Sequence, residues 1–415
     1  MTASQPHDPY AALRHGDFRW YILSVMAMTV ATQIRGVVVG WQLYQLTHDP
    51  LVLGLVGLAE ALPFIAAALF AGHAADTTDR RRLTLIAMVA LLGCAAALLG
   101  LVLSHPVDPR DVPWFYLIIG LSGIARSFLT AGRVALVAEL TPREHYANAS
   151  AWRASSWQFA AVMGPALGGL LYGFGGARLA YITDVGLMVV GVATLALVRP
   201  RGRPAGAPSE GMVASLGAGI RFVFAQPILL GALSLDLFAV LFGGAVALLP
   251  VFAADILHVG PQGLGLLRAA PAVGAVGMSL WLAHRPPLRQ GGAALFGSVA
   301  LFGVSIIAFA LSRNVWLSGA LLAFGGGVDM VSVVIRSVIL QEWTPPELMG
   351  RVAAVNSVFI GSSNEIGAFE SGTAAKLMGT IPSVIFGGVM TLAVVGVTAW
   401  RVPALRRLRE LRRTT

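Results

Sequence analysis

Long apolar runs recur along the whole sequence, and they restrict the available folds more than any other feature. A helix needs about 20 mostly apolar residues to cross a bilayer. Only 12% of the residues are charged, against about 25% in a typical soluble domain. The sequence therefore predicts an all-α membrane protein with twelve transmembrane helices, over residues 18–46, 51–75, 83–104, 113–138, 146–175, 178–198, 227–254, 262–284, 291–311, 314–340, 349–377 and 380–400.

A stretch rich in Pro, Gly and Arg, residues 199–211, separates the first six runs from the last six. Such a composition is typical of a linker. The apolar segment behind it carries a lone Arg221, which indicates a short amphipathic helix at the membrane surface. We expect an N-terminal six-helix half, a cytoplasmic linker with this helix, a C-terminal six-helix half and a basic tail, over residues 1–198, 199–226, 227–400 and 401–415.

The positions of Arg and Lys predict the orientation, because cytoplasmic loops of membrane proteins are rich in both. With a cytoplasmic N-terminus, nineteen of the twenty-nine lie on the cytoplasmic side, six lie inside spans and four lie outside. We therefore expect both termini in the cytoplasm. This asymmetry accounts for the net charge of +9. Since no basic face is interleaved with aromatic residues, we expect no nucleic-acid partner.

The two halves are repeats of each other. At a shift of 203 positions, residues 133–144 align with residues 336–347, and the coincident pairs are Arg133/Arg336, Glu139/Glu342, Thr141/Thr344, Pro142/Pro345 and Glu144/Glu347. At a shift of 211, residues 49–55 align with residues 260–266. Two six-helix halves repeated in parallel are the layout of transporters of the major facilitator superfamily.

The turn between the second and third predicted spans resembles the best-known motif of that superfamily, Gly-x-x-x-Asp-x-x-Gly-Arg-Arg. Gly72, Asp76, Arg80 and Arg81 match it, whereas Asp79 stands where a glycine is usual. The resemblance implies a gate whose charges pair when the inside is shut. A simple topology anchor is the alternative reading.

The fifth predicted span contains "MGPALGG", which resembles the end of the antiporter motif associated with export in this superfamily. The matching residues are Gly164, Pro165, Gly168 and Gly169, while Ala151 and Ala160 replace the motif's upstream glycines. Small residues allow close helix packing, and a proline removes one backbone hydrogen bond. Ordinary close packing is therefore the alternative.

The chain as a whole looks like the branch of the superfamily that contains the enterobactin exporter and the macrolide efflux proteins. The stretches that carry this likeness include "GWQLYQLTHDPLVLGLVGLAEALP", "GPALGGLL" and "MGRVAAVNSVFIGSSNEIGAFESG". The resemblance implies a multi-pass protein of the bacterial inner membrane that exports a small organic molecule as a monomer.

Ionisable residues inside spans are the candidate functional residues, because each costs at least about 2.5–3.5 kcal/mol at the bilayer centre unless it faces a cavity or a partner. Arg126 and Asp329 are expected either to line the cavity or to pair helices. Arg133 and Arg336 are expected to form structural pairs, with binding of substrate as the alternative. Further cavity candidates are Arg35, Asn364 and Glu365.

Two deep carboxyls, Glu60 and Asp236, are the first candidates for carrying a coupled proton, with Asp184 next. A carboxyl in a low dielectric can exchange a proton near neutral pH. A static pairing of either residue with a buried arginine is an equally weighted alternative.

We expect a proton-coupled antiporter that works by alternating access. One alternative is a dedicated siderophore exporter, and another is a membrane sensor or assembly partner that transports nothing. The sequence has no nucleophile–base pair, no cluster with metal-ligand spacing and no GxxxxGK[ST] loop. We therefore expect no enzyme activity, metal or other cofactor, and no direct use of ATP.

The predicted orientation can be tested by thiol labelling in intact cells. After removal of Cys94, single cysteines at Ser209 or Thr415 should be shielded from a membrane-impermeant reagent, and cysteines at Pro109 or Asn314 should react. The reverse pattern would contradict the orientation that the arginines predict.

Overall fold

The structure is a computed structural model, and it describes residues 8–199, 212–285 and 290–408. In these ranges the regular elements are all helices. The first half holds five long helices, α1 Gly16–Thr47, α2 Pro50–Thr77, α3 Arg80–Ser104, α4 Val112–Leu140 and α5 Tyr146–Ala196. Short 3-10 turns flank them, η1 Ala12–Arg14, η2 Pro109–Asp111 and η3 Arg143–His145.

The remaining elements follow the stretch rich in Pro, Gly and Arg at residues 199–211, of which only Arg199 lies within the described residues. The amphipathic helix expected there is present as α6 Met212–Ala225. The long helices are α7 Pro227–Phe242, α9 Gly260–Ala283, α10 Gly291–Leu311, α11 Val315–Trp343, α12 Met349–Met378 and α13 Thr380–Arg401. The short elements are η4 Ala245–Leu248, α8 Leu249–Val251, η5 Phe252–Ile256, η6 Pro346–Leu348 and α14 Pro403–Arg406.

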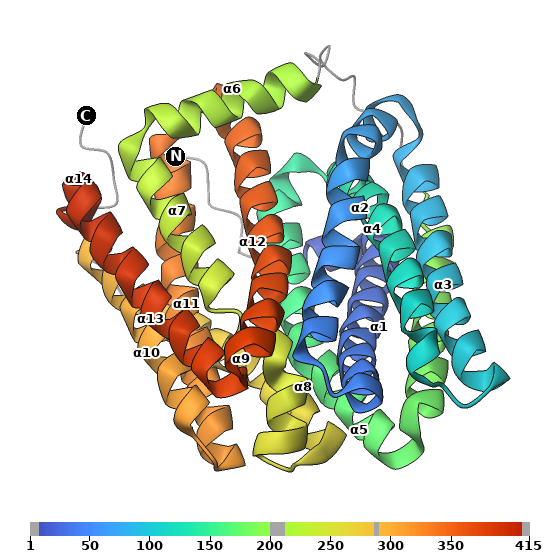
Figure 1. The fold of residues 1–415 in the computed structure, drawn as a ribbon. Helices are drawn as coiled ribbons and strands as arrows, with labels where there is room; N and C mark the ends of the chain where they lie inside the picture. Colours follow the sequence, from blue (N-terminus) through green and yellow to red (C-terminus); the bar gives the residue numbers. More distant parts are fainter. Residues whose placement is uncertain (1–7, 200–211, 286–289, 409–415) are drawn as a thin grey trace.

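Ten of the described helical segments are long and apolar enough to cross a membrane. One of them, the 51-residue α5, bends at Gly176, whose φ of +63° is the left-handed conformation that favours glycine. The two arms of α5 therefore supply two crossings. Helix α12 is more polar and is not among the ten, but it has 30 residues and runs alongside the others (Figure 1). The fold is consistent with the twelve predicted spans.

The seventh predicted span, residues 227–254, differs from the expectation of one continuous helix. Helix α7 ends before Gly243, and the chain continues through a 3-10 turn and the π-helical turn η5. Both glycines at this break are needed for close contacts. A Cβ at Gly243 would lie 2.6 Å from Phe302, and a Cβ at Gly244 would lie 2.5 Å from the Ser371 hydroxyl.

The repeat seen in the sequence also appears in the order of the helices. Helices α4 and α11 each have 29 residues and begin 203 positions apart, at Val112 and Val315. The same offset separates the starts of α5 and α12, at Tyr146 and Met349. Helices α1 and α7 begin 211 positions apart. Residues at these offsets therefore occupy corresponding positions in the two halves.

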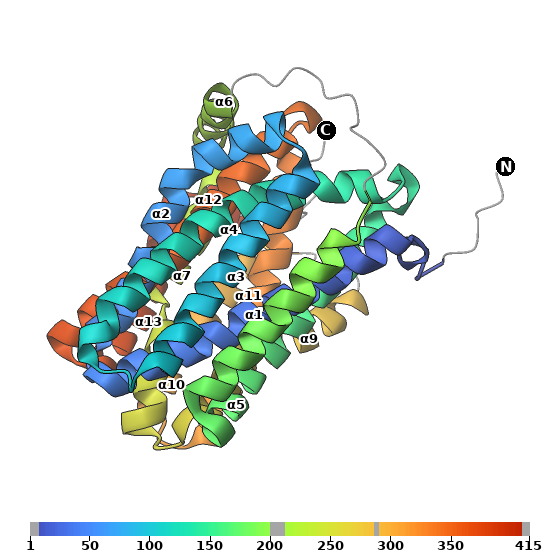
Figure 2. The same ribbon diagram turned by 90° about the vertical axis from the view of Figure 1, so that its right-hand side faces the viewer.

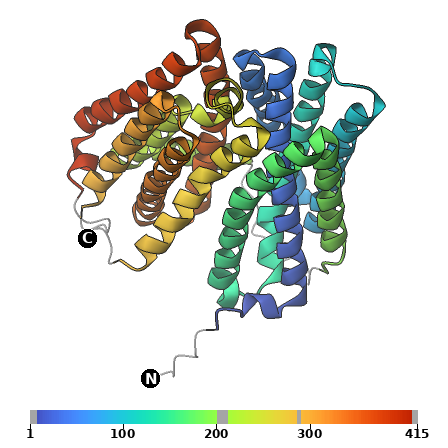
Figure 3. The ribbon, with the colours of Figure 1, turned by 90° about the horizontal axis from the view of Figure 1, so that it is seen from below.

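The helices form two groups that meet along one boundary. Helices α1–α5 lie on one side and α7 with α10–α13 on the other (Figure 1), and the view from below separates the two groups (Figure 3). Within the first group, α2, α4, α3 and α5 lie side by side (Figure 2). We call the end covered by α6 the α6 face, and the end that carries the α5 bend the Gly176 face.

Two helix pairs make the most extensive contacts across the boundary, α5 with α9 and α2 with α12. Both contacts depend on glycine. A Cβ at Gly169 of α5 would lie 2.4 Å from the Pro261 carbonyl oxygen, and a Cβ at Gly372 of α12 would lie 2.7 Å from the Cα atom of Gly54. These residues lie toward the Gly176 face, where one apolar core joins Tyr44 and other residues of the first half to residues of the second half. The halves are thus packed together near the Gly176 face.

The "MGPALGG" segment makes close contacts on both sides of α5. Added Cβ atoms at Gly164 and Gly168 would lie 2.4 Å and 3.1 Å from atoms of α1, whereas Gly169 faces α9. Pro165 lies inside the helix, where its missing N–H weakens the backbone ladder. The segment therefore brings one helix close to its own half and to the opposite half.

The Gly169 contact can be tested by adding side-chain volume. In Gly169→Val the new atoms meet backbone that has no room to move, so we expect a loss of about 1–3 kcal/mol in unfolding free energy. The measurement is thermal unfolding of the purified protein. Gly277→Val in α9 is the matched control, because no atom lies within 4 Å of a Cβ there. Equal effects of the two variants would contradict the packing described.

Candidate functional site

A network of charged side chains lies at the boundary between the halves. An Arg126 Nη1 on α4 donates a hydrogen bond to Glu60 Oε1 on α2 at 2.6 Å. The second amino group of Arg126 contacts Glu365 Oε1 on α12 at 3.4 Å. The three side chains are 34%, 21% and 22% exposed, respectively. One guanidinium thus joins a carboxylate of its own half to a carboxylate of the opposite half.

Small residues bring the three helices of the network together. A Cβ at Gly123 on α4 would lie 2.4 Å from the Glu60 carbonyl oxygen, and a Cβ at Gly57 on α2 would lie 3.0 Å from the Glu365 carbonyl oxygen. Phe64 on α2 lies under the Arg126 guanidinium, with 5.3 Å from Cζ to the ring centroid. Any larger residue at either glycine would push the carboxylates away from Arg126.

Arg268 of α9 completes the network from the second half. Its Nη1 donates to the Gly36 carbonyl oxygen of α1 at 3.3 Å. A Cβ at Gly36 would lie only 3.1 Å from the guanidinium, so glycine leaves room for this contact. Glu60 and Glu365 both act electrostatically on Arg268. Two cations and two carboxylates therefore face one another across the boundary, which keeps the total charge of the network near zero.

Asp236, a candidate from the sequence, lies in a separate cluster inside the second half. Its carboxylate forms an ion pair with Arg336 of α11, and both residues are buried. Asp329, about two turns before Arg336 on α11, interacts electrostatically with both. The buried hydroxyl of Ser332 on the same helix has no hydrogen-bond partner. The Asp236 cluster does not reach the boundary network.

Arg35 and Asp184 form a third charged pair, inside the first half. The Arg35 guanidinium binds both carboxylate oxygens of Asp184, at 2.8 Å and 3.0 Å. The residues are 8% and 0% exposed. Arg35 is therefore held in the packed interior between α1 and α5, although the sequence suggested it for the cavity. Asn364, in contrast, is exposed beside Glu365, and its amide donates to the Ile360 carbonyl oxygen.

The predicted gating motif lies on the α6 face, at the turn from α2 to α3. Gly72 is buried near the end of α2, Arg80 begins α3, and Arg81 donates to the Ala196 carbonyl oxygen of α5 at 2.6 Å. Asp79, which replaces the usual glycine, caps α3 by accepting from the Arg82 backbone N–H. This cap gives the departure from the motif a physical reason. The side chain of Asp76 lies outside the described residues.

Two polar contacts between the halves, which the sequence analysis missed, lie at the Gly176 face. Lys376 of α12 donates to Asp49 Oδ2 before α2 at 2.6 Å, and Tyr44 of α1 donates to Asp255 of η5. Partial burial acts to raise the pKa of Asp49, but the hydrogen bonds from Lys376 and the Leu51 N–H outweigh it and lower the pKa. This ion pair therefore persists until the pH falls below the usual range of an aspartate. The only signal in the sequence was opposite charge in two loops on the same predicted side.

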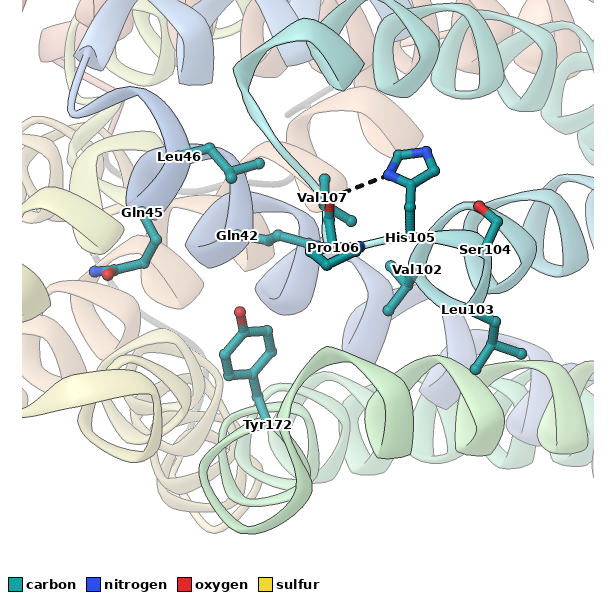
Figure 4. Close-up of a pocket in the computed structure, with 10 residues that line it drawn as sticks. All are labelled: Gln42, Gln45, Leu46, Val102, Leu103, Ser104, His105, Pro106, Val107 and Tyr172. Carbon is teal, nitrogen blue, oxygen red and sulfur yellow. Dashed lines mark hydrogen bonds between the residues drawn. The ribbon is translucent and has the colours of Figure 1, made fainter.

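A pocket of about 580 Å³ opens at the Gly176 face within the first half (Figure 4). Gln42 and Gln45 of α1, His105 after α3 and Tyr172 of α5 line it together with apolar residues. Its described lining contains no Asp, Glu, Lys or Arg. Because it involves only one half, this pocket is separate from the charged network.

Among the described residues, no group of three or more His, Cys, Asp or Glu side chains is arranged to hold a metal ion.

Residues 20–368 match the family model of the Major Facilitator Superfamily, so the chain belongs to this family. It is a membrane transporter rather than an enzyme. The enterobactin exporter EntS of Shigella flexneri is 28% identical over 95% of this chain and 94% of its own length. The EntS protein of Citrobacter koseri is 27% identical with the same coverage.

Solved transporter structures share the fold at low sequence identity. A bacterial homologue of the iron transporter ferroportin in the inward-facing state has a TM-score of 0.68 and 16% identity, covering 95% of this chain and 99% of its own. A bacterial homologue of the lysosomal transporter Spinster, inward-facing and unoccupied, has a TM-score of 0.66 and 14% identity, covering 98% of both chains. These likenesses show the fold alone.

The Arg35–Asp184 pair can be tested as a purely structural contact. Asp184→Ala leaves a buried guanidinium without its partner, so we expect a loss of about 3–5 kcal/mol in unfolding free energy. The double variant Arg35→Met, Asp184→Leu should recover most of it, because no buried charge remains. Thermal unfolding of the purified variants is the measurement, with exposed Arg110→Gln as control. A double variant less stable than Asp184→Ala would contradict this reading.

Proposed function

We propose that this transporter exports a small organic molecule from the cytoplasm by proton-coupled antiport, working as a monomer. The charged network of Glu60, Arg126, Glu365 and Arg268 is the observation on which the proposal rests. It lies at the boundary between the halves, and alternating access moves the halves against each other at such a boundary. An interaction across this boundary differs between the two end states, which is what coupling requires.

The α6 face is, in this proposal, the cytoplasmic face of the inner membrane. Most Arg and Lys residues in the predicted loops belong to this side, in agreement with the preference of cytoplasmic loops for positive charge. The Gly176 face, with the Asp49–Lys376 and Tyr44–Asp255 contacts, then faces outward. A conformation packed together at that face is closed to the outside. The gating motif at Gly72, Asp76, Arg80 and Arg81 would close the opposite side in the alternate state.

Proton coupling follows from what the pairing requires. Glu60 and Glu365 must both be ionised to bind Arg126, so closing the outer face around Arg126 releases protons toward the cytoplasm. In the outward-open state Glu365 moves away with its half, and either carboxyl is then free to take a proton from outside. The protonated carboxyl returns with its half to the inward-open state, and it releases the proton to the cytoplasm when it pairs with Arg126 again. Each export step is thereby linked to the entry of a proton.

The geometry favours Glu365, and with it Glu60, over Asp236 for this role, because the two glutamates share Arg126 across the boundary. The Asp236–Arg336 pair lies within one half, so rigid movement of the halves leaves it unchanged. The Arg35–Asp184 pair is likewise confined to one half. Glu365 is the carboxylate that contacts Arg126 across the boundary. Neutralising Asp236 would leave Arg336 buried without a counter-charge, which is a stability effect.

A siderophore is the substrate that the relatives favour. The enterobactin exporters match 95% of this chain at 27–28% identity. The guanidiniums and Phe64 of the network suit a molecule that combines acidic oxygens with aromatic rings. Enterobactin export is therefore the second, narrower form of the proposal.

Efflux from proteoliposomes tests the coupling. With enterobactin and a macrolide as test compounds, the parent protein should transport at least one faster when a pH gradient is imposed. Glu60→Gln and Glu365→Gln should lose this acceleration, because an amide cannot exchange a proton. Loss of a positioned charge typically lowers such rates by about 10²-fold or more.

Glu370→Gln is the matched control on α12. This carboxyl contacts Ser371 beside it and takes no part in the boundary network. Its transport should keep the full pH dependence. If Glu60→Gln and Glu365→Gln also keep it, neither carries the proton, and Asp184, Asp236 or Asp329 becomes the next candidate.

A further inference from the structure

Arg133 of α4 is a partly buried cation for which the described side chains provide no anionic partner. Its Nη2 lies 2.9 Å from the Met28 sulfur of α1. Of the side chains that the structure describes, no carboxylate comes within 4.0 Å of it. A thioether is only a weak acceptor, and an arginine inside a membrane protein normally pairs with an acid or faces a water-filled cavity. The structural pair expected from the sequence is not found here.

The second half shows which partner an arginine at the corresponding position binds. Arg336 corresponds to Arg133 at the shift of 203 and binds Asp236 of α7. At the shift of 211 that relates α1 to α7, Asp236 corresponds to Val25. The first half therefore keeps the arginine but replaces its carboxylate partner by an apolar side chain. Among the described residues, no other carboxylate takes the place of Asp236 beside Arg133.

Arg133 points away from the lipid-facing side of α4. At 100° per residue, Arg126, Thr130 and Arg133 lie within about 60° of one another. Leu117, Leu121 and Ile124 are exposed and lie roughly opposite, in a shallow apolar groove with α2. Thr130 is exposed although it lies on the inner side. Its exposure indicates open space next to the arginine face rather than close packing.

A second guanidinium lies near Arg133. Arg153 of α5 is exposed, and both arginines are close enough to Tyr21 of α1 to interact with it electrostatically. Tyr21 itself is 1% exposed. Arg133 lies seven residues before the end of α4 at Leu140, about 10 Å along the helix axis from the α6 face. The position is therefore between that face and the Arg126 network.

We propose that Arg133, assisted by Arg153, binds the acidic group of the transported molecule, so that the substrate class is an organic anion. The proposal rests on the proposed export function and identifies where the substrate is first held. A carboxylate or similar two-oxygen acid accepts two parallel hydrogen bonds from a guanidinium. The substrate thus supplies the counter-ion that Asp236 supplies in the other half. From there it lies about two helical turns from Arg126.

Binding to the purified full-length protein tests the proposal without transport. The probes are salicylate, an aromatic acid, and salicylamide, its neutral analogue, at matched ionic strength. The parent should bind salicylate in equilibrium dialysis and should bind salicylamide at least tenfold more weakly. Arg133→Gln should weaken salicylate binding by about tenfold or more, since a hydrogen bond to a charged group is lost. Arg133→Lys keeps the charge but lacks the planar guanidinium, so its affinity for salicylate should lie between the affinities of the parent and of Arg133→Gln.

Arg178→Gln is the matched control, because it removes an exposed arginine of the same half at the Gly176 face and should bind salicylate as the parent does. If Arg133→Gln does not fold, the Arg133→Lys measurement decides. The proposal is overturned if the parent binds no salicylate, if salicylamide binds equally well, or if neither Arg133 variant differs from the parent by more than twofold.

The two proposals fail in different ways. Anion binding that depends on Arg133, without gradient-driven efflux, would overturn the export function alone. Gradient-driven efflux of a neutral or cationic compound that Arg133→Gln leaves unchanged would overturn the anion site alone.

Discussion

The cost of placing a charge in a bilayer is the constraint on which this structure depends. Every buried guanidinium must find an acceptor, and the kind of acceptor distinguishes the sites. Arg35 binds Asp184 within one half and Arg336 binds Asp236 within the other. Such pairs move as rigid parts of their half. Arg126 divides its contacts between the halves, and among the described side chains Arg133 contacts the Met28 sulfur rather than a carboxylate. The divided contacts of Arg126 suit a switch between two states, and the unsatisfied guanidinium of Arg133 suits the binding of a ligand.

Close glycine contacts allow these charges to meet. Gly57 and Gly123 bring α2 against α12 and α4, and Gly169 brings α5 against α9. A contact made by backbone and small side chains has little interdigitation, so two helices can separate and meet again without repacking large residues. The same positions cannot accept a Cβ in this conformation. The helix pairs that cross the boundary therefore meet through small residues, as several pairs inside each half also do.

Much of the fold could be predicted from the sequence, because bilayer thickness fixes helix length and the repeat fixes helix order. The offset of 203 read from Arg133 and Arg336 recurs at the starts of α4 and α11 and of α5 and α12. The sequence did not predict the break after α7, because an apolar run that contains Gly243 and Gly244 looks like an uninterrupted span. The sequence also could not predict which charged residues pair with one another. Glu60 and Asp236 look alike in an apolar helix. Only the tertiary contacts show that the arginine bound to Glu60 also binds Glu365 of the other half, whereas Asp236 is paired inside its own half.

The differences between the two repeats are more informative than their likeness. Both halves keep an arginine at one position near the end of α4 or α11, so the backbone tolerates the charge equally in each. The second half neutralises it with Asp236 and adds Asp329, whereas the first half has Val25 and Arg126 at the corresponding places. Two identical halves would carry two neutral pairs and leave a substrate nothing charged to bind. At these two places the first half has no acid, so Arg133 is left to an anionic substrate, whereas Arg126 is balanced at the boundary by Glu60 and Glu365. An anion that moves on from Arg133 can exchange places with Glu365 on Arg126.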